Sequence, residues 1–178
     1  MGAESAPCAV SIANDVTPVT SCQVGSVNND NPLPGQVNAD AMFGFSDWSF
    51  AEKQKWDAAW VNDDESVDIG LSLVGNGLAG TWSINNIWGN ISHLMLVFKG
   101  GAGNTTPDDY VGYLIVNGAI AGTYNTPFVQ TNNNAKAKNI SHVTAYYRGA
   151  AQVPEPVLLS LVGLGLTSAV VRRRRKQS

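Results

Sequence analysis

Apolar and polar positions alternate with a period of two over much of this chain. From position 42 onward, short runs of aliphatic and aromatic residues are separated by turns that contain Gly and Asn, and no segment before position 157 keeps an apolar period of 3.6. A period of two is typical of half-buried strands, whereas an amphipathic helix repeats every 3.6 residues. We therefore predict an all-β fold for residues 42–150, an antiparallel β-sandwich or a jelly-roll-like arrangement.

The predicted strands are short and closely spaced. They cover residues 43–50, 66–74, 80–88, 93–98, 110–116, 119–124 and 142–148. Asn117-Gly118 predicts a hairpin between two of them, because both residues tolerate positive φ. Residues 51–60 are ambiguous, since their propensities suit a short helix while their surroundings favour a strand. Residues 1–41 are rich in Ser, Asn, Asp and Pro, which predicts a loop-rich segment with two short strands.

A sequence motif occurs twice. Asn90-Ile91-Ser92-His93 and Asn139-Ile140-Ser141-His142 are 49 residues apart, and a base followed by Gly comes at the same distance after each. Two strands with equivalent starts would explain the match, and a repeat architecture would need at least three units. His93 and His142 could form a metal or acid–base pair. We favour imidazoles that bond loop carbonyls, because no Gly-x-Ser-x-Gly, His-Glu-x-x-His or phosphate-loop motif accompanies them.

The last part of the chain departs from the strand pattern. Pro154-Glu155-Pro156 precedes Val157–Val171, which has no charged side chain, and five basic residues follow: Arg172, Arg173, Arg174, Arg175 and Lys176. As a helix, the uncharged run would be about 22 Å long. That length is short for a bilayer core of about 30 Å, unless the bilayer thins or the arginines reach the interface.

Charge predicts how this tail is oriented. Basic clusters stay on the cytoplasmic side, so we expect a single C-terminal transmembrane helix with residues 1–153 on the far side. A buried core helix is disfavoured, since the run is apolar nearly all round. An anchor that is never processed is the other alternative.

The whole tail resembles the PEP-CTERM sorting signal of Gram-negative bacteria. The resemblance covers residues 153–178 and rests on Val153, Pro154, Glu155 and Pro156, on the Leu- and Gly-rich run, and on the Arg cluster. It implies recognition by an exosortase, a membrane transpeptidase that supplies its own catalytic Cys. The four motif residues would be its substrate. The tail would anchor the protein transiently in the inner membrane and then be removed, leaving the protein at the cell surface or in the extracellular matrix.

Residues 43–149 are similar to the globular domains that often precede this signal. The similarity is carried by Phe43-Gly44-Phe45-Ser46-Asp47-Trp48, Gly80-Thr81-Trp82-Ser83-Ile84 and Leu96-Val97-Phe98-Lys99-Gly100. It implies no catalytic residues and no cofactor, so we expect a non-enzymatic surface or matrix protein. The alternatives are a carbohydrate-binding surface module, in which an exposed Trp stacks on sugar rings, and a secreted hydrolase.

Charge is divided unevenly along the chain. Of 11 basic and 14 acidic residues, five basic and one acidic lie in residues 153–178, which leaves a net charge of −7 before them. A nucleic-acid partner is disfavoured, because phosphate binding needs a basic surface. Asp63, Asp64, Glu65 and Asp68 could hold Ca²⁺, as could Asp108-Asp109, but the spacing is not that of an EF-hand and solvated turns are favoured.

Cys8 and Cys22 are the only cysteines. In an exported protein they predict one disulfide that pins the N-terminal segment, and a metal pair is disfavoured because both His residues are far away in sequence. Residues 1–13 show neither the basic nor the apolar region of a secretion signal. Export therefore predicts an in-frame secretion leader upstream of Met1.

Overall fold

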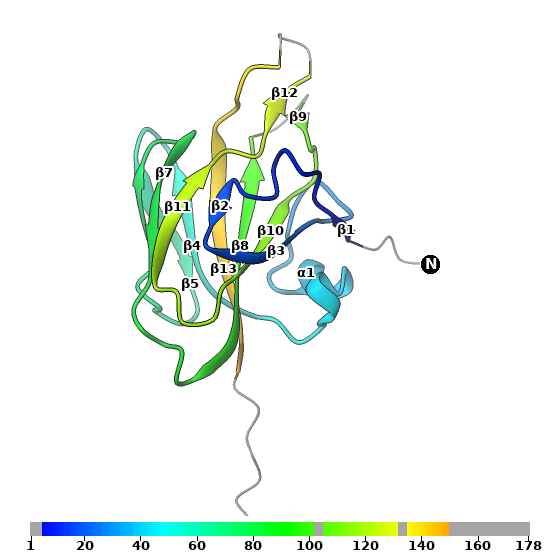
Figure 1. The fold of residues 1–178 in the computed structure, drawn as a ribbon. Helices are drawn as coiled ribbons and strands as arrows, with labels where there is room; N and C mark the ends of the chain where they lie inside the picture. The colour runs from blue at the N-terminus through cyan, green and yellow to red at the C-terminus, as the bar shows by residue number, and fades with distance from the viewer. Residues whose placement is uncertain (1–4, 102–104, 132–134, 150–178) are drawn as a thin grey trace, which may run out of the picture.

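Two antiparallel β-sheets pack face to face in the computed structural model, which describes residues 5–101, 105–131 and 135–149 (Figure 1). The larger sheet has seven strands in the spatial order β1 (Ala6–Pro7), β3 (Val19–Val24), β10 (Val111–Ile115), β8 (Ile91–Gly100), β13 (Ile140–Gly149), β4 (Ser49–Trp56) and β5 (Trp60–Glu65). The smaller sheet has four, in the order β2 (Val16–Thr17), β11 (Ala121–Asn125), β7 (Ala79–Ser83) and β6 (Ser72–Gly75). Strands β9 (Thr105–Thr106) and β12 (Val129–Gln130) form a separate pair. The all-β prediction is confirmed.

The main core lies between the two sheets. Its buried side chains include Leu94, Leu96, Phe98 and Val143 from the larger sheet and Leu73, Trp82 and Tyr124 from the smaller one. Strand β8 is buried on its other face as well, where Met95 and Val97 belong to a second apolar cluster. A strand with both faces covered needs no polar positions, which explains the unbroken apolar run of residues 94–98.

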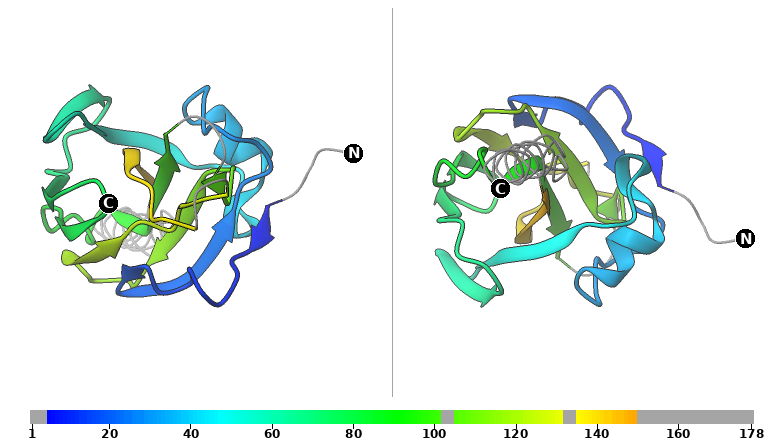
Figure 2. Two further views of the ribbon diagram at one scale, coloured as in Figure 1. Left: turned by 90° about the horizontal axis from the view of Figure 1, so that it is seen from above. Right: turned by 90° about the horizontal axis from the view of Figure 1, so that it is seen from below.

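Residues 25–48 cover the outer face of the larger sheet (Figure 2). This segment contains helix α1 (Gly35–Ala39) and the 3-10 turn η1 (Met42–Gly44). Its Val37, Met42 and Trp48 complete the second cluster. Asn38 fastens the segment to itself, because its side chain accepts a hydrogen bond from Trp48 N at 2.7 Å and donates one to Trp48 O at 3.0 Å.

The strand predicted over residues 43–50 is wrong for most of its length. Phe43 has a φ of 58°, in the left-handed region, and the strand begins only at Ser49. The aromatic residues of this stretch are spaced like strand residues, but they pack as a cover on the sheet. Phe45 and Trp48, for example, meet edge to face with ring centroids 5.9 Å apart. Burial produced by tertiary packing has overridden the local pattern.

The hairpin predicted at Asn117-Gly118 is also wrong. A tight turn does form, since Ala119 N donates to Val116 O at 3.0 Å and Gly118 has a φ of 88°. The strands on either side of it nevertheless belong to different sheets, because β10 pairs with β3 and β8 whereas β11 pairs with β2 and β7. Both edges of β10 are occupied, so the chain after the turn must cross to the smaller sheet.

The ambiguous residues 51–60 form a hairpin instead. Strand β4 pairs with β5, Trp56 lies opposite Trp60, and Asp57 N donates to Ala59 O at 2.9 Å in the turn between them. The predicted strand 66–74 is shorter in the structure, where β6 starts at Ser72. Strands at 93–98 and 142–148 are confirmed, and both extend further as β8 and β13.

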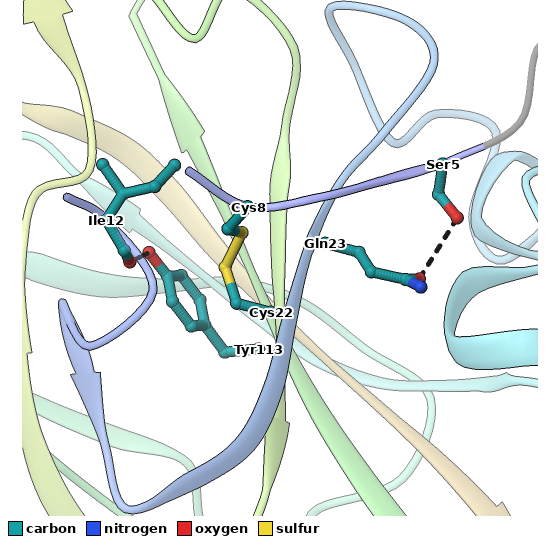
Figure 3. The surroundings of a disulfide bond; sticks show 6 residues. All are labelled: Ser5, Cys8, Ile12, Cys22, Gln23 and Tyr113. Atoms are coloured by element: carbon teal, nitrogen blue, oxygen red, sulfur yellow. Dashed lines mark hydrogen bonds between the residues drawn. A yellow bond between two sulfur atoms is a disulfide. The ribbon is translucent and has the colours of Figure 1, made fainter. Parts of the chain in front are cut away.

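The N-terminal residues are part of both sheets. β3 lies between β1 and β10, and β2 pairs with β11. Cys8 and Cys22 form the predicted disulfide, with Cα atoms 5.4 Å apart (Figure 3). Cys8 N also donates to Cys22 O at 3.1 Å, and Tyr113 OH donates to Ile12 O at 2.9 Å. The loop closed by the disulfide is therefore bonded to the edge of the larger sheet.

The predicted sorting signal lies outside the described residues. This applies to Val153, Pro154, Glu155 and Pro156, to the run Val157–Val171, and to the basic cluster at 172–176. Among the residues that the structure does describe, no helix is long and apolar enough to cross a bilayer.

Candidate functional site

The two copies of the Asn-Ile-Ser-His motif begin adjacent strands. β8 and β13 run antiparallel side by side, so the start of each strand lies beside the end of the other. The register shifts at both places. Ile140 lies opposite Gly100 and His142 opposite Lys99, which leaves Ser141 as an extra residue. At the other end of the pair, Ser92 is the extra residue.

The extra serines make equivalent hydrogen bonds. Ser141 Oγ lies 3.0 Å from Lys99 O and 3.3 Å from Gly100 O. Ser92 Oγ lies 2.9 Å from Gly149 O and 3.4 Å from Arg148 O. An inserted residue disrupts the ladder of main-chain hydrogen bonds, and each hydroxyl supplies a donor to the carbonyls at that point. The two copies of the motif thus occupy equivalent positions at opposite ends of the antiparallel pair β8 and β13, which gives the pair a local two-fold symmetry.

The two histidines are far apart in this arrangement. His142 lies opposite Lys99 and His93 lies opposite Arg148, six residues along β8 and so about 20 Å away. They cannot share a metal ion or a proton, so the interpretation as a metal or acid–base pair is wrong. The favoured interpretation also needs correction, because the serines bond the carbonyls while the imidazoles bond other side chains.

His142 binds a buried carboxylate. Its Nε2 lies 3.1 Å from Oδ1 of Asp30, whose other oxygen accepts a hydrogen bond from Tyr146 OH at 2.8 Å. Asp30 has no solvent-exposed surface. Burial opposes its ionisation, but the hydrogen bond and charge of His142 and the hydroxyl of Tyr146 outweigh that effect, so the pKa of Asp30 lies below its ordinary value. The same burial and carboxylate raise the pKa of Tyr146.

A second buried carboxylate lies nearby in the same covering segment. Asp40 accepts hydrogen bonds from Ser26 N and Oγ, from Gln36 Nε2 and from Tyr110 OH, at 2.6 to 2.8 Å. Tyr110 and Tyr146 belong to the larger sheet or its immediate flank. The two aspartates therefore fasten residues 25–48 to the sheet through polar bonds, beside the apolar contacts described above.

Lys99 lies beside His142 at the end of β8. Its side chain is nine-tenths buried and donates from Nζ to Asp108 O at 2.9 Å. Burial lowers the pKa of Lys99, and the neighbouring Asp108 and Asp109 only partly oppose that effect. A cavity of about 300 Å³ opens between these groups, lined by Asn28, Asn29, Lys99, Gly100, Gly101, Asp108, Ser141 and His142. The Oδ1 atom of Asn29 is buried and accepts no hydrogen bond from any described residue.

Ser141, His142 and Asp30 follow one another in space like a nucleophile, a base and an acid. Ser141 Oγ is 3.3 Å from His142 Nδ1, and Asp30 lies at the opposite ring nitrogen. In catalysis the base must accept the proton of the nucleophile. Here the hydroxyl lies closer to Lys99 O. Ser92 makes the same bonds beside His93, whose ring bonds no carboxylate among the described residues. The geometry therefore favours a structural role for Ser141.

His93 has a different environment. Its Nδ1 lies 3.1 Å from Arg148 Nη1, and Arg148 also binds Asp47 through two nitrogens. The guanidinium lies over the ring of Phe45, 3.7 Å from its centroid. Burial and then the charge of Arg148 lower the pKa of His93. Because a guanidinium can only donate, Nδ1 is the acceptor in the contact with Arg148. Through Asp47 and Phe45, Arg148 of β13 thus holds the C-terminal end of residues 25–48 on the sheet.

The acidic clusters serve local contacts. Asp63 pairs with Lys53 at 2.8 Å, while Asp64 and Asp68 accept main-chain hydrogen bonds from Glu65 and Gly70. Within the part of the chain that the structure describes, no three His, Cys, Asp or Glu side chains lie close enough together to hold a metal ion.

The tryptophans divide into two groups. Trp48 and Trp82 are buried, as expected for core residues, while Trp56, Trp60 and Trp88 are only partly covered. Asp30, Asp40 and Lys99 were not singled out as site residues by the sequence. Asp30 stands in Asn28-Asn29-Asp30-Asn31-Pro32, which has the composition of a solvated turn, and its partners follow more than a hundred residues later.

Comparison with protein-family models, with curated proteins and with solved structures gave no match.

Proposed function

We propose that this chain is an exported cell-surface or extracellular-matrix protein, sorted by an exosortase through residues 153–178. The observation that carries the proposal is the order of three blocks in one tail: Pro154-Glu155-Pro156, then Val157–Val171 without charge, then the basic cluster at 172–176. In this order the basic cluster stays in the cytoplasm, the uncharged run lies in the bilayer, and the acidic motif is presented outside, where a membrane transpeptidase can reach it.

The disulfide supports export. Structural disulfides persist in oxidising compartments and are rare in the cytosol, and Cys8–Cys22 joins two segments that also pair through main-chain hydrogen bonds. The position of the tail is also consistent with processing. Only four residues separate Gly149, the last residue of β13, from Pro154. Extended, these can span about 14 Å, so the enzyme would work close to the end of the sandwich.

We propose a binding or structural role for the folded part. Its best-formed acid–base group, Asp30 with His142 and Tyr146, has both carboxylate oxygens engaged in holding residues 25–48 on the sheet. The adjacent Ser141 hydroxyl is directed at main-chain carbonyls. These bonds support a structural role for the cluster, which is to stabilise the fold.

The sorting proposal can be tested by following the mass of the protein. The chain is fused to a secretion leader and expressed in a host with an exosortase and in the same host without it. We expect a shortened form only when the enzyme is present. Replacing Pro154, Glu155 and Pro156 with Ala should leave the full-length, membrane-held form, whereas Gln152→Ala should be processed like the original. A triple variant that is shortened and located like the original protein would refute the proposal.

A further inference from the structure

A second hollow, of about 400 Å³, lies at the end of the sandwich where β4 ends and β13 begins. Its lining includes Trp56, Gly101, Gln130, Lys138, Asn139 and Ser141. Gly101 and Ser141 also line the cavity beside His142, so the two hollows adjoin. None of the residues discussed above as holding the covering segment contributes a side chain to the Trp56 side.

Trp56 differs from the other tryptophans in its hydrogen bonding. The indole N–H groups of Trp48, Trp60, Trp82 and Trp88 each donate to an oxygen, at 2.8 to 3.0 Å. The indole N–H of Trp56 donates to no described residue. Tryptophan N–H groups usually find a partner when they are covered. Trp56 is therefore a partly covered aromatic residue that lines the hollow and keeps its donor unused among the described residues.

The ring of Trp56 packs against neighbours in the fold. Trp60 meets it edge to face, with ring centroids 5.4 Å apart. Trp60 Nε1 donates to Tyr124 OH at 2.8 Å, and Tyr124 OH donates to Asn76 O at the same distance. Gly77 fits against the edge, where an added Cβ would lie 2.9 Å from Trp56 Nε1. A platform fixed in advance loses little freedom when a ligand binds.

Polar groups of suitable kind surround the ring. The side-chain amides of Gln130 and Asn139 make no hydrogen bond to any other described residue, and each offers both donors and an acceptor. Lys138 is the one charged side chain among the described lining residues, and it already has an interaction partner. The hollow thus combines the indole of Trp56 with two uncharged amides and one lysine, a composition in which a few polar contacts can fix the orientation of a small molecule.

We propose that the Trp56 hollow binds an uncharged hexopyranose unit of a polysaccharide. A pyranose ring has an apolar face of C–H groups that can lie on an indole and a rim of hydroxyls that both donate and accept, which matches the ring of Trp56 and the amides beside it. A polyanionic chain is disfavoured, because residues 1–152 carry a net charge of −7.

The position of the hollow suits a protein that is attached to the membrane through its C-terminal residues. Strand β13 starts at the hollow with Ile140 and ends at Gly149, beyond which the tail follows (Figure 1). The hollow therefore lies at the end of β13 opposite to Gly149. Sugar binding at this site does not rest on the sorting proposal, since a protein that is never processed would still present the hollow.

The test uses the full chain, oxidised and kept in a zwitterionic detergent that has no sugar headgroup. Indole groups are labelled with ¹⁵N, and maltohexaose, cellohexaose, mannohexaose and, as an acidic control, hexagalacturonate are titrated in turn. We expect a neutral hexaose to shift the Trp56 indole signal, which is identified by its loss in Trp56→Phe. The expected Kd is about 1 mM, because a site that contacts a single sugar unit binds weakly.

Variants separate stacking from hydrogen bonding. Trp56→Ala should weaken binding at least tenfold, and Gln130→Ala and Asn139→Ala about fivefold each, while Trp88→Phe should leave it unchanged. The other indole signals report whether each variant keeps its fold. Gln130→Ala and Asn139→Ala retain Trp56, so they test the site even if Trp56→Ala unfolds.

Three results would overturn the proposal. These are the absence of any shift with every neutral hexaose at 20 mM, binding that persists in all three hollow variants, and binding of hexagalacturonate alone. None of these results would bear on sorting, because processing is measured from the mass of the protein.

Discussion

Asp30 shows how one residue can hold a segment in place. It belongs to a loop, has no exposed surface, and uses both carboxylate oxygens to bind groups on β13. A buried carboxylate is stable only when it is paired and hydrogen-bonded. His142 and Tyr146 meet that requirement, and together they fix where the covering segment begins.

Removing this carboxylate should therefore be costly. Asp30→Ala removes the carboxylate partner of the buried Tyr146 OH and of His142 Nε2, and we expect the free energy of unfolding to fall by about 3 kcal/mol. Urea denaturation followed by tryptophan fluorescence would measure it. Asp47→Ala is the matched control, since that carboxylate is also paired with a cation of β13 but lies on the surface. It should have a much smaller effect, and equal losses for the two variants would contradict our assignment.

The pH dependence of Asp30 has a definite sign. Its pKa is lower in the folded than in the unfolded chain, where it is about 3.8. The unfolded state therefore binds the proton more readily, and the stabilisation, fully present above about pH 4, is lost as pH falls further through the folded-state pKa. The free energies of unfolding of the original protein and of Asp30→Ala should converge in acid. A gap that stays constant from pH 7 to pH 2 would contradict this.

Little of this residue-scale detail could be predicted from the sequence. Tyr146 is placed correctly in a predicted strand, and His142 was selected because its motif repeats. Asp30 gave no signal, because its burial depends on a partner 112 residues away and not on its neighbours. Trp56 is one of five tryptophans in the sequence, and only the structure distinguishes it by its unused indole N–H.

At the scale of elements, the pair β8 and β13 is the most regular feature. Each strand begins with Ile-Ser-His, each serine is the extra residue at a shift in register, and each hydroxyl bonds the carbonyls at the end of the neighbouring strand. The motif repeat in the sequence predicted equivalent starts. It did not predict that the strands are neighbours, because the motif fixes local geometry and not the pairing partner. The wrong hairpin at Asn117-Gly118 has the same cause.

The two serines should contribute equally to stability. Ser92→Ala and Ser141→Ala each remove a half-buried hydroxyl that donates to main-chain carbonyls, and we expect each to cost about 1 kcal/mol. Because they lie at opposite ends of the strand pair, the double variant should lose the sum to within about 0.5 kcal/mol. Denaturant titration of the four proteins would check this.

Ser83→Ala offers a control within the smaller sheet. Ser83 is also half-buried in a strand, but its hydroxyl bonds no described residue, so its removal should have little effect. A large loss of stability for only one of the Ser92 and Ser141 variants would show that the two serines, although equivalent in geometry, do not contribute equally to the free energy of unfolding.

At the scale of the whole molecule, the alternating pattern sufficed for the all-β class and for the antiparallel strands. It did not reveal the cover formed by residues 25–48, because that segment is buried by contact with a sheet face made of strands distant in sequence. Nor did it show that residues 16–24 run inside both sheets. The disulfide was predicted, and it joins Cys8, directly after the edge strand β1, to Cys22 in β3.

Loss of the disulfide should weaken the entire fold. It closes a loop with a sequence separation of 14, for which chain entropy gives about 3 kcal/mol. We expect Cys8→Ser/Cys22→Ser to unfold at correspondingly lower urea concentration. Dithiothreitol should destabilise the original protein by the same amount and leave the variant unchanged. Equal midpoints for the oxidised protein and the variant would contradict this expectation.

Strand β13 also determines how the molecule would respond to a pull. A load applied between the hollow at Ile140 and the chain beyond Gly149 runs along this strand, which is hydrogen-bonded to β8 on one side and β4 on the other. Antiparallel hydrogen bonds are perpendicular to the strands, so the force would shear both ladders at once instead of opening them one bond at a time. A pull along β13 is thus resisted by the hydrogen bonds of two strand pairs together.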